Sequence, residues 1–135
     1  GQEWVAANRS DGMGVRLLRE DGFEVVVLST ETNPVVTARC RKLEIEATQG
    51  VGDKAAVLEA LLRDRGIPQE HVVYMGNDRN DLPVYPLVGC FFAPADAYPE
   101  VQARADIVVS MPGGHGAVRE MADILLTNKK REGLK

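Results

Sequence analysis

The sequence predicts an α/β fold: a doubly wound, mostly parallel β-sheet with helices packed on both of its faces. Three short runs are apolar at consecutive positions, which is typical of strands that are covered on both faces. These runs are Val25 to Leu28, Val72 to Met75 and Ile107 to Val109. Segments with helical apolar spacing lie between them and after them, and this alternation of strand and helix indicates the doubly wound class.

The first two expected helices have recognisable ends. Asp11 can cap a helix that runs to about Glu20, and Gly22 follows it as a stop signal. Pro34 can occupy the first position of the next helix, where its missing N–H costs nothing. Before the first helix, residues 2–8 are expected to form a short strand.

The remaining elements follow the same pattern. A short strand is expected near Ile45, and Asp53 can cap a third helix that Gly66 ends. The apolar residues of that helix form one stripe: Val57, Leu58, Leu61 and Leu62. The last helix is expected from about Gly116 to Thr127.

Length and charge bound the class of protein. The chain has 135 residues and is expected to form one domain over residues 1–128, followed by a polar tail at residues 129–135. Its net charge of -4 arises from 16 basic and 20 acidic residues without a block of like charges, so no nucleic-acid partner is expected. No apolar run approaches the roughly 18 residues that a membrane span requires, so no membrane partner is expected either.

The two cysteines and the start of the sequence bear on localisation. Cys40 and Cys90 lie on apolar-rich segments without Cys or His at metal-ligand spacing, which fits thiols in a reducing compartment. No signal-peptide pattern opens the sequence. We therefore expect a cytoplasmic protein.

Polar residues follow the expected strands directly. Ser29-Thr30-Glu31 comes after the first apolar run, Lys54 follows the strand near Ile45, and Gly76-Asn77-Asp78-Arg79-Asn80-Asp81 follows the second run. In an open parallel sheet, ligands bind beyond the carboxyl ends of the strands. A hydroxyl, an ammonium and a cluster of hard oxygen ligands at that edge suit a phosphate held beside Mg²⁺.

Each of these residues also has a structural explanation. Ser29 can cap a helix, Lys54 can be solvated in a first helical turn, and Gly-Asn-Asp is a common turn composition. Their order along the chain, each directly after a strand, favours the functional interpretation.

The order of Ser29, Lys54 and the Gly76 to Asp81 stretch resembles motifs two, three and four of the haloacid dehalogenase superfamily. The resemblance extends over residues 1–126, and further stretches are similar to one branch of the superfamily, the capless branch. That branch contains 3-deoxy-D-manno-octulosonate (KDO) 8-phosphate phosphatases, nonulosonate 9-phosphate phosphatases and the phosphatase-like domain of acylneuraminate cytidylyltransferases. The stretches similar to this branch are Asp11-Gly12-Met13-Gly14, Leu82-Pro83, Ala93-Pro94-Ala95-Asp96-Ala97 and Gly113-Gly114-His115-Gly116-Ala117-Val118-Arg119-Glu120.

The resemblance implies roles for individual residues. Ser29 would be the phosphate-binding hydroxyl, and Lys54 the ammonium that steadies the nucleophile and the phosphate; we take both as catalytic. Asn77 and Asp78 would hold Mg²⁺, the expected cofactor. Asn77 departs from the usual Asp, and because an amide oxygen brings no charge, weaker metal binding is expected. His115 stands where the octulosonate branch often has Arg.

The first motif of the family is absent from this sequence. In the family, Asp-x-Asp-Gly at the end of the first strand supplies the nucleophile and the general acid, and none of the 135 residues forms it. Ser29 has no adjacent base that could activate it as a substitute. Because Gly1-Gln2-Glu3-Trp4 resembles the second strand of the hairpin that follows this motif, we expect the first strand to be missing and the chain alone to be inactive. The alternative is a natural chain that serves as a structural module.

The residues after Ser29 bear on the substrate. Octulosonate phosphatases usually continue with Gly-Arg, whereas here Thr30-Glu31 follows, and Lys42 comes eleven residues after Glu31. This Glu and Lys resemble the pair with which the nonulosonate branch recognises its longer sugar, so Thr30, Glu31 and Lys42 are expected to bind substrate. Both charges can also be ordinary exposed charges on a helix. The leading hypothesis is Mg²⁺-dependent hydrolysis of a phosphorylated nine-carbon 2-keto sugar acid through an aspartyl-phosphate.

Two other functions remain open. A non-catalytic oligomerisation or regulatory domain of the cytidylyltransferase type is favoured by the missing first motif and by Asn77. A flavodoxin-like binding module explains the fold without the ordered polar residues. Capless members resemble one another in forming tetramers, so a homotetramer is expected, with Trp4 and Val5 on a strand near an exposed sheet edge that pairs with another chain.

Overall fold

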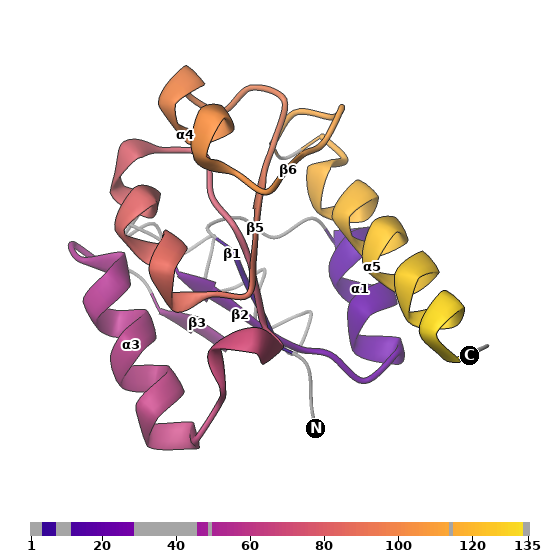
Figure 1. Cartoon of the computed structure of the whole chain (residues 1–135), viewed down its shortest axis with the longest axis horizontal. Helices are drawn as coiled ribbons and strands as arrows, with labels where there is room; N and C mark the ends of the chain where they lie inside the picture. Colours follow the sequence, from indigo (N-terminus) through magenta and orange to yellow (C-terminus); the bar gives the residue numbers. More distant parts are fainter. Residues whose placement is uncertain (1–3, 8–11, 29–45, 49, 114, 134–135) are drawn as a thin grey trace.

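The computed structural model describes residues 4–7, 12–28, 46–48, 50–113 and 115–133. Within these residues, six parallel strands form one sheet in the order β3-β2-β1-β4-β5-β6 (Figure 1). The strands are β1 (Trp4–Ala7), β2 (Glu24–Leu28), β3 (Glu46–Thr48), β4 (Val72–Met75), β5 (Cys90–Ala93) and β6 (Ile107–Val108).

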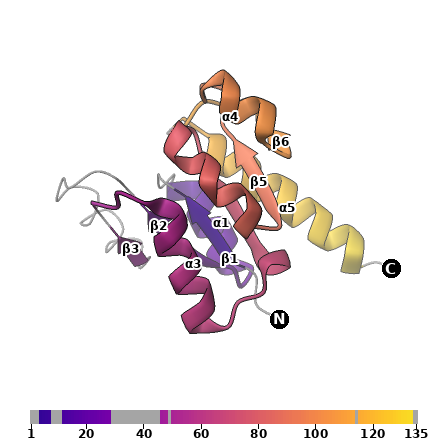
Figure 2. The same cartoon turned by 60° about the vertical axis from the view of Figure 1, so that its left-hand side comes forward.

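Helices cover both faces of this sheet (Figure 2). On one side, α1 (Gly12–Glu20) packs against α5 (Ala117–Gly133); on the other, α3 (Lys54–Arg65) packs against η2 (Arg79–Leu87), a 3₁₀ helix. A short 3₁₀ turn, η1 (Gln69–His71), leads into β4, and α4 (Pro99–Arg104) packs beside η2. The expected doubly wound α/β fold is confirmed.

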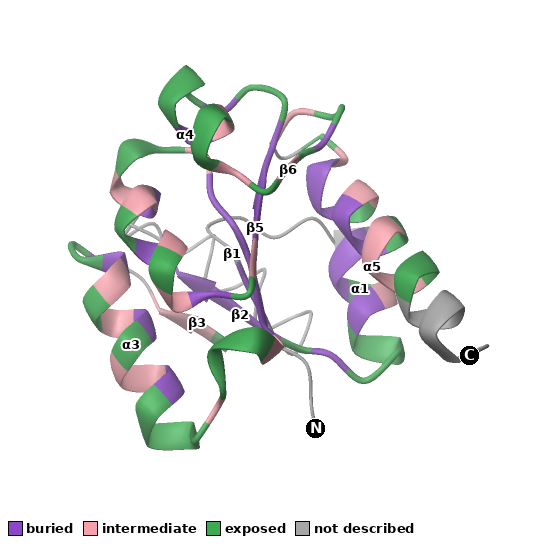
Figure 3. Cartoon of the chain, in the orientation of Figure 1, coloured by how far each residue is buried: buried purple, intermediate pink, exposed green. Residues whose placement is uncertain are grey.

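Strands β2, β4 and β5 are buried over most of their length (Figure 3), and successive residues of the central strands belong to the cores on opposite faces of the sheet. Val5, Val27 and Met75 belong to the core beneath α1 and α5. Ala6 and Tyr74 belong to the core beneath α3 and η2. Burial on both faces explains why these strands are apolar at consecutive positions.

Gly14 sets the distance between α1 and α5. A Cβ atom at this position would lie 2.6 Å from the backbone nitrogen of Arg119 and 2.7 Å from the carbonyl carbon of Val118. Real Cβ atoms do not approach backbone this closely, so the two helices can pack at this distance only around a glycine.

The N-terminal strand does not lie at an edge of the sheet, so that expectation is wrong. β1 pairs with β2 on one side and β4 on the other, with Ala7 opposite both Val27 and Met75. Val5 and Ala6 are buried. A central position satisfies the backbone groups of β1 on both sides, which an edge position cannot do. The described sheet is therefore continuous from β3 to β6.

The helix ends agree with the capping signals where the structure describes them. The Asp53 carboxylate accepts a hydrogen bond from the Ala56 N–H at 3.0 Å, and Gly66 ends α3 in the left-handed conformation at φ 64°. The helix expected at Pro34 lies outside the described residues. α5 continues to Gly133, so residues 129–133 of the expected polar tail are helical. None of the described helices combines the length and apolarity needed to cross a membrane.

Candidate functional site

The polar residues that follow β4 lie at the carboxyl edge of the sheet. Because all described strands are parallel, their carboxyl ends share this edge, where Met75 is followed by Gly76, Asn77 and Asp78. Lys54, the first residue of α3, reaches the same place. The expected convergence is confirmed for Lys54 with Asn77 and Asp78. Ser29, Thr30, Glu31 and Lys42 lie outside the described residues.

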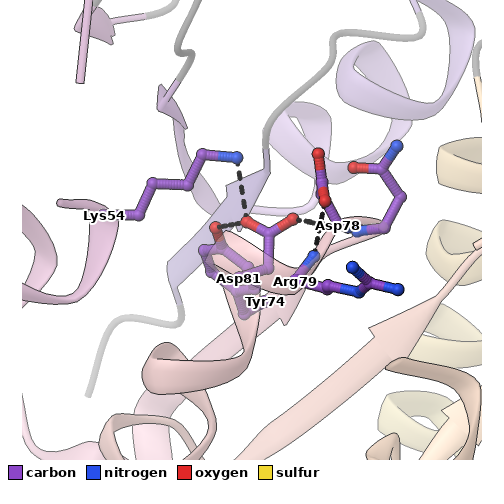
Figure 4. A network of polar contacts seen from close by, with 6 residues as sticks. Lys54, Tyr74, Asp78, Arg79 and Asp81 are labelled. Atoms are coloured by element: carbon purple, nitrogen blue, oxygen red, sulfur yellow. Dashed lines mark hydrogen bonds and ion pairs between the residues drawn. The ribbon is translucent and has the colours of Figure 1, made fainter. Parts of the chain in front are cut away.

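Asp81 connects these elements (Figure 4). Its Oδ1 accepts hydrogen bonds from Lys54 Nζ at 3.0 Å and from the Tyr74 hydroxyl at 2.5 Å. Its Oδ2 accepts from the backbone N–H groups of Asn77 and Asp78, both at 3.0 Å. One fully buried carboxylate therefore holds the ammonium, the strand and the turn in a fixed arrangement.

Gly76 makes room for this carboxylate. A Cβ atom at Gly76 would lie 2.6 Å from Cβ and 2.8 Å from Cγ of Asp81, and 2.9 Å from the Phe91 ring. Any side chain at this position would force Asp81 or the Phe91 ring to move. The glycine that opens the Gly76 to Asp81 stretch is thus required by a close approach of side chains.

Reciprocal capping fixes the turn that carries Asn77 and Asp78. Asp78 caps η2 through its carboxylate, which accepts from the Arg79 N–H at 2.6 Å, while Asp81 accepts from the Asp78 N–H. The Asn77 carbonyl accepts from the Tyr98 N–H at 3.1 Å. The backbone of this turn is therefore held from both sides, and the exposed Asp78 side chain stays at the surface.

Lys54 is a buried cation with a buried counter-charge. Its side chain is 3% exposed and that of Asp81 is 0% exposed. A charge buried without a partner is costly, so the pair depends on its mutual attraction and on the further donors to Asp81. An ammonium has three N–H donors, and the bond to Asp81 uses one of them.

Tyr74 remains a hydrogen-bond donor at every physiological pH. Burial raises the pKa of its hydroxyl far above the ordinary value of 10.0, and the Asp81 carboxylate raises the same pKa further. The Tyr74 ring packs against Phe91 with ring centroids 5.4 Å apart.

Two further turns line the same edge beyond β5 and β6. The Asp96 carboxylate accepts from the Gly113 N–H at 2.8 Å, and the Met111 carbonyl accepts from the Ala95 N–H at 3.0 Å. His115 is exposed beside them in sequence. The contact between Asp96 and Gly113 joins two of the stretches that resemble the capless branch, residues 93–97 and 113–120.

Sequence reasoning gave Asp81 no site role and did not consider Tyr74. Asp81 ends the stretch that resembles motif four, but its partner Lys54 lies 27 residues away in the chain. The available signal was a tyrosine inside the apolar run Val72 to Met75, because a buried hydroxyl needs a hydrogen-bond partner.

The side-chain oxygens at this edge are of the chemical type that binds hard cations such as Mg²⁺. Asn77 and Asp78 offer amide and carboxylate oxygens, and Mg²⁺ typically takes one or two protein carboxylates and completes its shell with water and phosphate oxygens. Across the described ranges, no group of three or more His, Cys, Asp or Glu residues could hold a metal ion. A complete shell would therefore need further oxygens.

The fold and this edge define a class: an open parallel α/β protein with a buried lysine and an oxygen-rich turn at the carboxyl ends of its strands. Residues 30–121 match the family model of haloacid dehalogenase-like hydrolases. Over 127 residues the chain is 39% identical to the KDO 8-phosphate phosphatase KdsC of Escherichia coli K12, with 93% of this chain and 68% of the relative covered. The Yersinia pestis KdsC is 37% identical over 135 residues, with 98% and 72% covered.

Solved structures agree with these relatives. The cobalt-bound KDO 8-phosphate phosphatase of Haemophilus influenzae superposes with a TM-score of 0.85 at 29% identity, covering 93% of this chain and 87% of that one. The Yersinia pestis KDO 8-phosphate phosphatase gives a TM-score of 0.84 at 29% identity, covering 98% and 84%. The chain belongs to the haloacid dehalogenase-like hydrolase family.

Proposed function

We propose that this protein is a phosphatase that hydrolyses the phosphate monoester of a 2-keto sugar acid at the carboxyl edge of its sheet. The observation that carries the proposal is the buried Lys54 ammonium, held by Asp81 beside the Asn77 and Asp78 turn. A fixed positive charge next to oxygen ligands for a metal cation is an arrangement that stabilises the negative charge on a phosphoryl group. The curated relatives support the class, because they are named KDO 8-phosphate phosphatases.

Each residue has a part in this reaction. Lys54 neutralises charge on the phosphate and steadies the nucleophile, while Ser29 donates its hydroxyl to a phosphoryl oxygen. Asn77 and Asp78 supply oxygen ligands for Mg²⁺, which when bound offsets the charge of the phosphate. A solved relative binds cobalt, which supports divalent metal use. The nucleophilic aspartate of the expected aspartyl-phosphate would come from an Asp-x-Asp-Gly sequence outside these 135 residues.

For the substrate we propose a nonulosonate 9-phosphate in preference to KDO 8-phosphate. The support is the sequence after Ser29, where Thr30 and Glu31 replace the usual Gly-Arg and Lys42 follows. A carboxylate can accept hydrogen bonds from sugar hydroxyls, and an ammonium can meet the acid group of the substrate. The net charge of -4 gives no reason to expect nucleic acid as a partner, and we propose a cytoplasmic location.

The test is phosphate release by the encoded protein that contains residues 1–135. Both sugar phosphates are supplied in turn, with Mg²⁺ or with excess chelator. We expect a higher kcat/KM for the nine-carbon substrate, loss of that preference in Glu31→Ala and Lys42→Ala, and no release with chelator. Lys54→Ala is expected to lower kcat by about a hundredfold. Arg63→Ala, which removes an exposed cation from the same helix, is the matched control and should leave kcat unchanged.

The outcomes separate the parts of the proposal. Full activity of Lys54→Ala would contradict the assigned site, and a higher kcat/KM for KDO 8-phosphate would overturn only the nine-carbon preference. A protein that contains Asp-x-Asp-Gly yet releases no phosphate from either substrate would overturn the phosphatase assignment.

A second function is a non-catalytic oligomerisation or regulatory domain of an acylneuraminate cytidylyltransferase. The amide at Asn77 and the absence of Asp-x-Asp-Gly in these residues favour it. Either function is compatible with the homotetramer that we propose from the resemblance. Light scattering tests the assembly: a species near four times 14.7 kDa is expected, and a monodisperse species near 14.7 kDa would exclude the tetramer.

A further inference from the structure

Two donors share one oxygen of Asp81. Oδ1 accepts from Lys54 Nζ at 3.0 Å and also from the Tyr74 hydroxyl at 2.5 Å. Tyr74 lies on β4, is fully buried and is braced by Phe91. The hydroxyl therefore reaches the carboxylate from a rigid strand, whereas the ammonium reaches it from the flexible stem of a lysine.

The second donor changes what Lys54 can do. A carboxylate oxygen that already accepts a strong hydrogen bond attracts an ammonium less, because part of its charge is compensated by the first donor. Without the hydroxyl, Asp81 would hold Lys54 more tightly and neutralise more of its charge. If Oδ1 were free to move, the Lys54 ammonium that is hydrogen-bonded to it would no longer be held in one place.

We infer that Tyr74 is a positioning residue whose hydroxyl holds Asp81 Oδ1 in place and moderates its pull on Lys54, so that the ammonium stays available to an anion at the carboxyl edge. The inference rests on the proposed function for its anion, a phosphate group. It assigns Tyr74 a role that acts through Lys54 and does not require contact with the substrate.

Tyr85 provides a matched control within the same chain. Its hydroxyl also donates to an aspartate, Asp106, at 3.1 Å, and its ring also faces Phe91, with centroids 6.0 Å apart. Asp106 is exposed, whereas the ion pair with Lys54 is made by the buried Asp81. Tyr85→Phe thus removes a tyrosine–aspartate hydrogen bond that involves neither Asp81 nor Lys54.

The first measurement is the affinity of the 135-residue chain for inorganic phosphate in the presence of Mg²⁺, by calorimetry. We expect Tyr74→Phe to weaken binding by roughly three- to tenfold, the scale of one hydrogen bond to a charged group, and Tyr85→Phe by less than about twofold. The same pair is then compared in a Lys54→Met background. There, Tyr74→Phe should have no further effect, because the hydroxyl acts through the ammonium.

A structural role alone predicts a different result. If Tyr74→Phe only loosens the fold, both tyrosine variants will weaken phosphate binding alike, or the effect of Tyr74→Phe will persist in the Lys54→Met background. Either result would overturn the inference. Thermal unfolding of each variant identifies the fraction that is folded at the temperature of the binding measurement.

The second measurement does not depend on phosphate. The Lys54 ammonium is buried and hydrogen-bonded, so its ¹H–¹⁵N resonance should be protected from exchange with water. We expect this resonance to shift in Tyr74→Phe and to stay in place in Tyr85→Phe. An unchanged resonance in Tyr74→Phe would refute the inference. If the resonance shifts in Tyr74→Phe but the wild-type chain binds no phosphate, the result counts against the proposed function alone.

Discussion

The two faces of the sheet are closed in different ways. Beneath α1 and α5 the buried core is apolar throughout the described residues and is drawn together by the close approach at Gly14. Beneath α3 and η2 an apolar core ends, at the carboxyl edge, in the buried Lys54–Asp81 pair and the Tyr74 hydroxyl.

The difference indicates what each face contributes. Apolar burial stabilises a fold without directional demands, whereas a buried ion pair loses solvation and seldom adds net stability over apolar residues of similar volume. The charged pair is therefore better explained by the chemistry of the site than by folding. The α1 and α5 face is closed by apolar packing, and the α3 and η2 face carries the charged pair to which the proposed function assigns its chemistry.

Removing the charge of Asp81 is expected to have the largest effect on stability. Asp81→Asn leaves the Lys54 ammonium buried without a counter-charge, at a cost of about 3–5 kcal/mol in the free energy of unfolding. Urea unfolding at neutral pH measures this loss. The matched control is Asp106→Asn, which alters an exposed carboxylate that likewise accepts from a tyrosine hydroxyl and from a backbone N–H. Equal losses of unfolding free energy in the two variants would mean that burial of the ion pair does not make the loss of its carboxylate charge more costly.

The apolar face is tested at Gly14. In Gly14→Ala the new methyl group would overlap the backbone of α5, so the helices must move apart; with part of the cost offset by the better helix propensity of Ala, we expect a net loss of about 1–2 kcal/mol. Gly52→Ala is the control, because a Cβ atom there meets nothing within 4 Å, and it should change stability by less than about 0.5 kcal/mol. A neutral Gly14→Ala variant would show that the interface between α1 and α5 is loosely packed.

The smallest expected effect concerns Glu120 in the first turn of α5 and its contacts with Ser110 and Met111. A hydrogen bond from the Ser110 hydroxyl, helped by the Ser110 and Met111 N–H groups, lowers the pKa of Glu120 below its ordinary 4.5. Because the folded-state pKa is depressed, the stabilisation is present above about pH 4.5 and is lost as pH falls through the lower folded-state value. Solvent screening keeps it under about 1 kcal/mol.

Glu120→Gln therefore should lower stability slightly at pH 7, and its difference from wild type should shrink as the pH falls below about 4.5. Denaturant unfolding at a series of pH values follows that difference. Glu59→Gln, on an exposed part of α3, is the control. A difference that grows in acid would contradict the sign of the argument.

Local signals in the sequence account for much of the fold. Val72 to Met75 forms β4 with the predicted bounds, and Asp53 and Gly66 cap α3 as predicted. These features depend on residues within one turn or strand, where apolar pattern and capping chemistry act directly. The approximate position of Lys54 at the carboxyl edge followed from the same local information.

Tertiary structure alone decided the rest. The position of Trp4–Ala7 at the centre of the sheet depends on which strands pair, and no local pattern in a buried four-residue strand specifies its neighbours. The Asp81 network likewise joins β4, α3 and η2 across 27 residues of sequence, and Gly76 is needed only because those elements meet. The sequence determined which residues could carry the chemistry; packing decided which of them share a hydrogen-bond acceptor, the Asp81 carboxylate, because such contacts exist only once the chain is folded.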